Sequence, residues 1–139
     1  MPKRMLYIVS SSVALICGCL IYILFRDNSY VGNLFINFVF MRYIIEIVGW
    51  IECDFVKFYF PDFLWGFSLC LALYAIYTPS KTGELFCSLI VFLIGIFWEL
   101  MQYLNIVSGT GDIYDILMYF LASITCIIIS IWSEKDEKN

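Results

Sequence analysis

Four long apolar runs constrain this chain more than any other feature. They cover residues 6–25, 63–78, 85–104 and 113–132, and each is close to the roughly 20 residues that a helix needs to cross hydrocarbon. Lipid offers the backbone no hydrogen-bond partners, so each run is expected to be helical. The sequence therefore predicts one membrane domain over residues 1–139: an all-α, polytopic integral membrane helical bundle. About four transmembrane helices and an interfacial or re-entrant helix would form it.

Composition supports this class and excludes others. Hydrophobic residues make up 63% of the chain and charged residues 14%, against about 45–50% and about 25% in soluble domains. Membrane lipid is therefore an expected partner. The net charge is −4 with no basic stripe, so we expect no nucleic-acid partner. Histidine is absent, which excludes imidazole metal sites and histidine-dependent triads. The six cysteines lack zinc-site spacing, and we interpret them as small buried apolar side chains.

The segment 28–60 is apolar and aromatic but is interrupted by charges. Arg42 and Glu46 are four residues apart, so they would share a helix face and could pair. A lipid-exposed span that carried these charges would be costly. We therefore expect this segment to be an extracytoplasmic interfacial or re-entrant helix that rests on the bundle.

The distribution of lysine and arginine predicts the orientation. With four spans and a cytoplasmic N-terminus, five basic residues lie inside and three outside, as the positive-inside rule expects. Both termini, including the tail 133–139, are then predicted to be cytoplasmic. The inside set is Lys3, Arg4, Lys81, Lys135 and Lys138, and the outside set is Arg26, Arg42 and Lys57.

This topology gathers the polar residues of the spans near the outer surface. Asp62 begins the second span, Glu99 and Gln102 lie near the outer end of the third, and Asp112 and Asp115 open the fourth. Ionisable groups within spans usually face the bundle interior and serve function. We expect the carboxylates to converge on a cation, a ligand amine or a phosphate-bound metal. No other cofactor is evident, and a divalent cation would find hard oxygen ligands in Glu99, Asp112 and Asp115.

Each of these residues also has a structural explanation. Glu99 could form a hydrogen bond that joins two helices. Asp112 could cap the fourth helix, and Asp115 would stand in its first turn, where negative charge suits the helix dipole. Pro61 and Asp62 suit the start of a helix in the same way. The sequence leaves both interpretations open.

Three short motifs resemble the VanZ-like family of small bacterial membrane proteins. They are "PDFLW" (61–65), "GIFWELMQ" (95–102) and "GTGDIYDILMY" (109–119), in this order on successive spans. The resemblance covers roughly the C-terminal 80 residues and implies a multi-pass protein of the bacterial cell membrane. It places the polar signature of the family on Asp62, Glu99, Gln102, Asp112 and Asp115, and we take Arg42, Glu46 and Trp65 as accessory candidates.

The chain departs from the family pattern in two places. Family members often have Asn and Gly where this chain has Met118 and Tyr119, and a basic residue often precedes the aspartate pair. The resemblance is therefore to a divergent member. It implies a link to tolerance of glycopeptide antibiotics of the teicoplanin type.

Three functions remain open from the sequence. The first is a membrane protein whose outward polar pocket binds an envelope ligand, such as a lipoglycopeptide or a lipid-linked wall precursor. The second is an enzyme that acts on a lipid-linked substrate with carboxylates and a divalent cation, although the motifs contain no nucleophile–base pair. The third is a small structural subunit in which the acids only cap and join helices.

Overall fold

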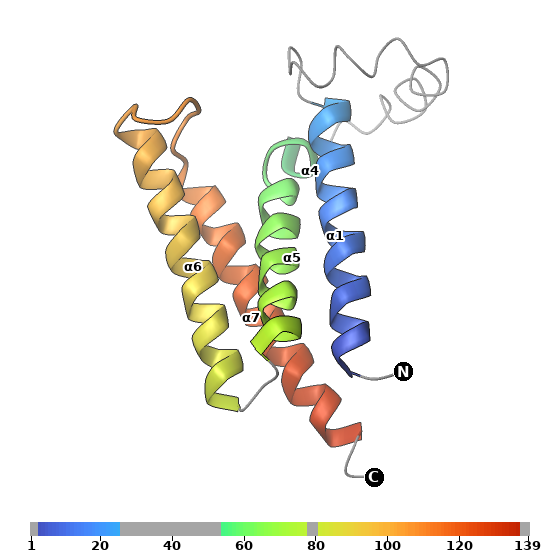
Figure 1. Cartoon of the computed structure of the whole chain (residues 1–139). Helices are drawn as coiled ribbons and strands as arrows, with labels where there is room; N and C mark the ends of the chain where they lie inside the picture. The colour runs from blue at the N-terminus through green and yellow to red at the C-terminus, as the bar shows by residue number, and fades with distance from the viewer. Residues whose placement is uncertain (1–2, 26–53, 78–80, 137–139) are drawn as a thin grey trace, which may run out of the picture.

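The computed structural model describes residues 3–25, 54–77 and 81–136. Within these ranges the chain is helical and has no strand, which confirms the predicted all-α bundle. The helices, labelled in Figure 1, are α1 (Lys3–Phe25), α4 (Asp54–Phe58), α5 (Phe60–Tyr77), α6 (Lys81–Tyr103) and α7 (Ile113–Asp136).

Four of these helices are long and apolar enough to cross a membrane: α1, α5, α6 and α7. Three of them begin earlier than their apolar runs, and α1 does so at Lys3. Helix α5 begins at Phe60, because a helix tolerates Pro61 in its first turn, where no backbone donor is needed. Helix α6 begins at Lys81 and so includes Glu84 in its first turn. The multi-pass membrane architecture follows.

The predicted interfacial segment is described only at its end. The short helix α4 lies there and directly precedes α5. Arg42 and Glu46, which we expected to pair, lie outside the described residues.

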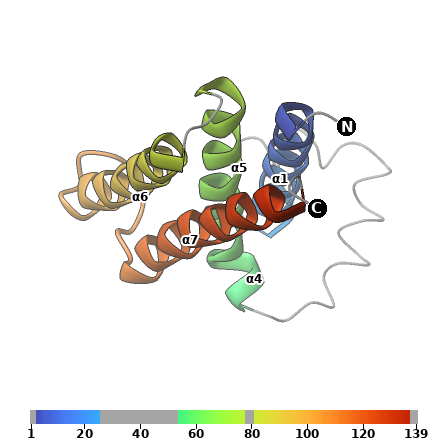
Figure 2. The same ribbon diagram turned by 90° about the horizontal axis from the view of Figure 1, so that it is seen from below.

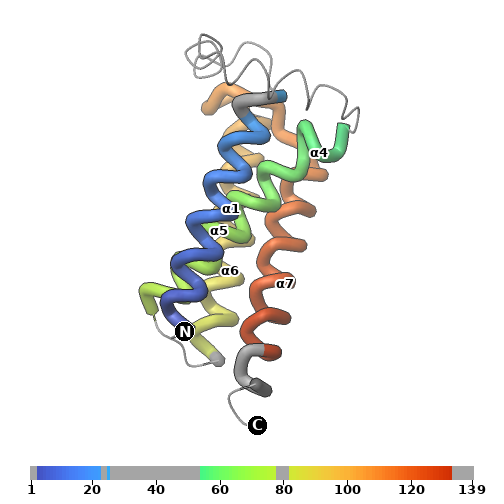
Figure 3. The backbone as a smooth tube through the Cα atoms, turned by 90° about the vertical axis from the view of Figure 1, so that its right-hand side faces the viewer, coloured from blue at the N-terminus to red at the C-terminus, as the bar shows by residue number. Residues whose placement is uncertain are grey.

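The four long helices alternate in direction. Helices α1 and α6 end, and α5 and α7 begin, at what we call the upper end, which is uppermost in Figure 1. The first residues of α1 and the last of α7 lie together at the lower end (Figures 1 and 3). An even number of candidate spans therefore places both ends of the described chain at one side.

Helix α5 is the centre of the bundle. It packs against α1, α6 and α7, and it lies between α1 and α6 when the bundle is seen from below (Figure 2). Its side chains supply much of the buried core, including Cys70, Leu71 and Tyr74. Cys87 and Cys126 are also buried, as expected, whereas Cys17 and Cys19 lie exposed on α1. The expectation of burial is therefore wrong for these two, because they lie on a part of α1 that no described helix covers.

Small residues let α1 approach α5 closely. The hydroxyl of Ser11 donates to the carbonyl oxygen of Ser68, and the hydroxyl of Ser68 donates to that of Ser11, each at 2.9 Å. About two turns further along α1, Gly18 faces the indole of Trp65. A methyl group on Gly18 would lie 2.8 Å from that ring. Contacts of this kind hold helices together in lipid, where burial of apolar surface gives no advantage.

Tyr119 of α7 packs between two glycines. A methyl group on Gly66 of α5 would lie 2.9 Å from the tyrosine ring, and one on Gly95 of α6 would lie 2.4 Å from it. The ring therefore occupies the space that any other residue at these positions would need. Tyr119 is itself buried, so one aromatic side chain joins α5, α6 and α7.

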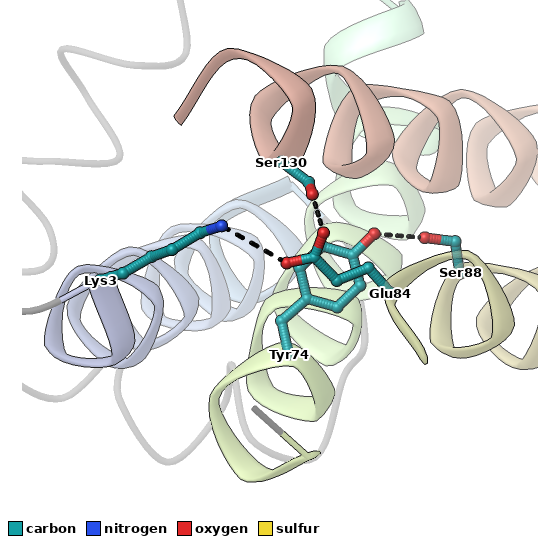
Figure 4. A network of polar contacts seen from close by, with 5 residues as sticks. All are labelled: Lys3, Tyr74, Glu84, Ser88 and Ser130. Atoms are coloured by element: carbon teal, nitrogen blue, oxygen red, sulfur yellow. Dashed lines mark hydrogen bonds and ion pairs between the residues drawn. The ribbon is translucent and has the colours of Figure 1, made fainter. Parts of the chain in front are cut away.

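A polar cluster joins the helices at the lower end (Figure 4). The Glu84 carboxylate of α6 is buried, lies 3.6 Å from the ammonium of Lys3 on α1, and accepts a hydrogen bond from Ser130 on α7. Beside it, Tyr74 of α5 and Ser88 of α6 share a hydrogen bond of 2.6 Å. The lower-end cluster thus compensates the charge of Glu84 within the bundle, as a buried carboxylate requires.

We predict that Gly95→Ala destabilises the bundle. The added methyl group would lie 2.4 Å from Tyr119, so α6 and α7 must separate, and such overpacking costs about 1–3 kcal/mol. Thermal unfolding of the purified protein in detergent would measure the loss. The double variant Gly95→Ala, Tyr119→Leu should recover part of it, because the ring is removed. An unchanged unfolding midpoint for Gly95→Ala would contradict this packing.

Candidate functional site

A cavity of about 660 Å³ lies at the upper end of the bundle. This volume falls within the roughly 300–1,000 Å³ typical of small-molecule sites. Side chains of α1, α4, α5 and α6, of the loop after α6, and of the first turn of α7 form its wall. The lining residues are Tyr22, Phe25, Lys57, Phe58, Tyr59, Pro61, Asp62, Trp65, Trp98, Glu99, Gln102, Val107, Ser108, Thr110, Asp112 and Asp115.

The polar residues singled out from the sequence all line this cavity. They come from three helices and the α6–α7 loop: Asp62, Glu99, Gln102, Asp112 and Asp115, with the accessory candidate Trp65. The prediction that Glu99 faces the bundle interior is confirmed, since only 3% of its surface is exposed. The accessory candidates Arg42 and Glu46 lie outside the described residues.

Asp112 is the N-cap of α7, as the sequence predicted. Its Oδ1 accepts a hydrogen bond of 3.0 Å from the backbone N–H of Tyr114, the second residue of the helix. Asp115 stands in the first turn, where its negative charge faces the positive end of the helix dipole. Helix geometry therefore explains part of the need for acids here.

Glu99 joins the end of α6 to the start of α7. Its Oε2 accepts a hydrogen bond of 3.1 Å from the backbone N–H of Asp112. Its second oxygen, Oε1, forms no hydrogen bond among the described residues, and neither Glu99 nor Asp112 has an ion-pair partner there. The hydrogen-bond donors to Glu99 and Asp112 in the described chain are neutral, so no cation of the described chain compensates their negative charges.

Gln102 holds the loop after α6 in place. With its amide oriented so that both neighbours are satisfied, the oxygen accepts from the indole N–H of Trp98 at 2.8 Å and the nitrogen donates to the Thr110 carbonyl at 3.2 Å. Gly109 lies against this amide with φ of +143°, and a methyl group there would be 2.7 Å from it. The loop can fold back over α6 only because a residue without a side chain occupies this position. Gln102 therefore shapes the cavity wall.

Aromatic side chains form much of the remaining wall. The rings of Tyr22 and Trp65 lie 5.4 Å apart, as do those of Tyr59 and Tyr114. Tyr59 makes a long contact of 3.5 Å to Asp112 Oδ2. Partial burial, and then the negative charges of Asp112 and Asp115, raise the pKa of the Tyr59 hydroxyl above its ordinary value. Tyr59 therefore keeps its proton and acts as a donor to Asp112.

Lys57 is the cationic residue that sequence reasoning did not assign to the site. It lies on α4, lines the cavity, and places its ammonium 5.7 Å from the ring centre of Phe25. Tyr22 and Tyr59 were also missed. The signal available for them was the clustering of aromatic residues at the ends of spans, which is typical of the membrane interface.

The arrangement can hold a cation by charge and by aromatic contact. Four carboxylates face one cavity together with two indole rings, and an ammonium group is attracted by both. In the described part of the chain, no three His, Cys, Asp or Glu side chains are arranged to hold a metal ion. The divalent cation stays a prediction from the sequence.

No known protein family, curated protein or solved structure matches the chain. The resemblance to the VanZ-like family therefore rests on the three motifs alone and stays a prediction.

We predict that Asp112→Ala and Asp112→Asn differ in stability. Alanine removes the acceptor of the Tyr114 N–H, and loss of a cap costs about 0.5–2 kcal/mol. Asparagine caps as well as aspartate, so its unfolding midpoint in detergent should stay close to that of the unchanged protein. Equal losses for both variants would show that charge, and not capping, stabilises the start of α7.

Proposed function

We propose that this chain is a multi-pass membrane protein that binds the cationic group of a cell-envelope ligand in the upper-end cavity. One observation carries the proposal: four carboxylates line a single ligand-sized cavity, and Glu99 and Asp112 have no ion-pair partner in the described chain. A bound cation would offset the repulsion between these like charges.

An amine fits this cavity better than a metal ion. Carboxylate oxygens can accept the hydrogen bonds of an ammonium group, and the faces of Trp65, Trp98 and the tyrosines attract the same charge. A divalent cation would need several oxygens gathered at one point, and the described side chains offer no such group.

We place the protein in the bacterial cell membrane with both termini in the cytoplasm and the cavity facing outward. The count of five basic residues against three supports this orientation. So does the position of both described chain ends at the lower end of the bundle. The VanZ-like resemblance suggests a glycopeptide or a lipid-linked wall precursor as the natural ligand, and tolerance of glycopeptides as an assay.

The structural-subunit hypothesis has its own support. Asp112 caps α7 and Glu99 joins α6 to α7, so both acids have a use without any ligand. These two roles require an acceptor oxygen and not a charge, and the amides asparagine and glutamine retain such an oxygen. Isosteric amide variants therefore separate the two hypotheses.

We predict that Glu99→Gln and Asp115→Asn abolish function at near-normal stability. Both keep hydrogen-bonding oxygens but remove negative charge from the cavity. The measurements are glycopeptide tolerance in a strain where the unchanged protein confers it, and thermal unfolding in detergent. Asp54→Asn is the matched control, because Asp54 is exposed on α4 and does not line the cavity. Unchanged tolerance for both cavity variants would favour the structural subunit.

We predict that the α6–α7 loop is outside the cell and that the start of α6 is inside. Single cysteines replacing Thr110 and Thr82, both exposed, would test this in a background that lacks the native cysteines. An impermeant maleimide should label the Thr110→Cys variant in intact cells, and the Thr82→Cys variant only after the membrane is opened. The reverse pattern would contradict the orientation.

A further inference from the structure

The wall of the upper-end cavity carries both signs of charge. The carboxylates lie on α5, α6 and α7, whereas Lys57 lies on α4. Lys57 forms no ion pair with these carboxylates, although it lines the same cavity, and its charged group lies over the Phe25 ring. The ammonium of Lys57 and these carboxylates thus line one space without an ion pair between them.

Glu99 marks the negative side of this space. The side chain is 97% buried, lines the cavity, and leaves Oε1 without a hydrogen bond among the described residues. Oε1 is not fully enclosed by protein atoms, so a donor in the cavity can reach this acceptor. A group that fills the cavity should therefore present a donor with positive charge to Glu99 and a negative group to Lys57.

The depth of the cavity indicates where such a molecule comes from. Its lining residues lie at the upper ends of all four candidate spans, which end or begin at Tyr22, Phe60, Tyr103 and Ile113. A bilayer has about 30 Å of hydrocarbon within about 40–45 Å of total thickness, and its head groups occupy the difference. The cavity therefore lies at the level of the phosphates and amines of lipid head groups.

Resting on the proposed amine-binding function, we propose that the cavity binds a zwitterionic head group in which a primary ammonium and a phosphate share a short linker, as in phosphatidylethanolamine. The ammonium donates to Glu99 Oε1, among the carboxylates. The phosphate lies on the α4 side and accepts from Lys57. The aromatic wall surrounds the linker, and the acyl chains remain in the bilayer beside the bundle.

Native mass spectrometry of the purified protein in detergent tests this assignment with phosphatidylethanolamine and phosphatidylglycerol of matched acyl chains, and with stearylamine, which has a single alkyl chain. Phosphatidylethanolamine carries both groups, phosphatidylglycerol carries only the phosphate, and stearylamine carries only the ammonium. The unchanged protein should retain phosphatidylethanolamine about tenfold more tightly than either of the others, because each lacks one charge-assisted contact.

Variants of the two charged sides separate this inference from the proposed function. Lys57→Met keeps the aliphatic stem over Phe25 and should lower the affinity for phosphatidylethanolamine to that for stearylamine, with stearylamine itself unaffected. Lys57→Arg should restore the preference, which a purely structural role of Lys57 in packing would not require. Glu99→Gln should weaken both amine-bearing lipids and leave phosphatidylglycerol unchanged.

Each contrary result overturns a defined part. If the protein binds stearylamine and phosphatidylethanolamine equally, and Lys57→Met changes neither affinity, the assignment of a zwitterionic ligand is wrong. The amine-binding function would then still stand. Amine-bearing lipids retained no better than phosphatidylglycerol would overturn both. Displacement of phosphatidylethanolamine by an equal concentration of soluble phosphoethanolamine would overturn the lipid as the source of the ligand.

Discussion

The contact of Tyr119 with two glycines sets how closely three helices approach one another. Gly66 and Gly95 leave room for the ring, and a methyl group at either position would overlap it. Helices in lipid associate through close packing and hydrogen bonds, because lipid tails are as apolar as the side chains they would replace. The upper parts of α6 and α7 are joined by a hydrogen bond, in which Glu99 accepts from the backbone N–H of Asp112. The geometry of the cavity thus depends on a packing contact about one turn below it.

Charge enters this bundle at two levels, and the two differ in how it is compensated. At the lower end, Glu84 has the ammonium of Lys3 and the hydroxyl of Ser130 as partners, so the cluster is satisfied within the chain. At the upper end, the described donors to Glu99 and Asp112 are backbone N–H groups and one tyrosine hydroxyl. Glu84 thus has a cation as a partner within the described chain, whereas Glu99 and Asp112 have none there. This contrast favours a structural role for Glu84 and a binding role for the cavity.

The spans and the convergence of Asp62, Glu99 and the aspartate pair were predictable, because hydropathy defines the helices and alternation of their directions brings those ends together. The cap at Asp112 was predictable from local residue types alone. The lower-end cluster was not predictable from the sequence. Glu84 and Lys3 lie at the margins of the apolar runs, where charged side chains are usually solvated at the membrane interface. Tyr22 and Tyr59 were missed for a different reason: which side chains enclose a cavity depends on rotation of each helix about its axis, and hydropathy does not fix that rotation.

The structural roles of Glu99 and Asp112 do not explain why these two residues are acids. A helix cap needs one acceptor oxygen, and serine or asparagine would supply it as well as Asp112 does. The bond from the Asp112 N–H to Glu99 would be equally well accepted by a glutamine. The charges of Glu99 and Asp112, which have no ion-pair partner in the described chain, instead repel one another in surroundings partly shielded from water. Under the proposed function, a ligand that brings a positive charge into the cavity would offset this repulsion. Under the proposed function, capping and binding are therefore compatible uses of the same side chains, because the cap needs only the oxygen and a cationic ligand needs the charge.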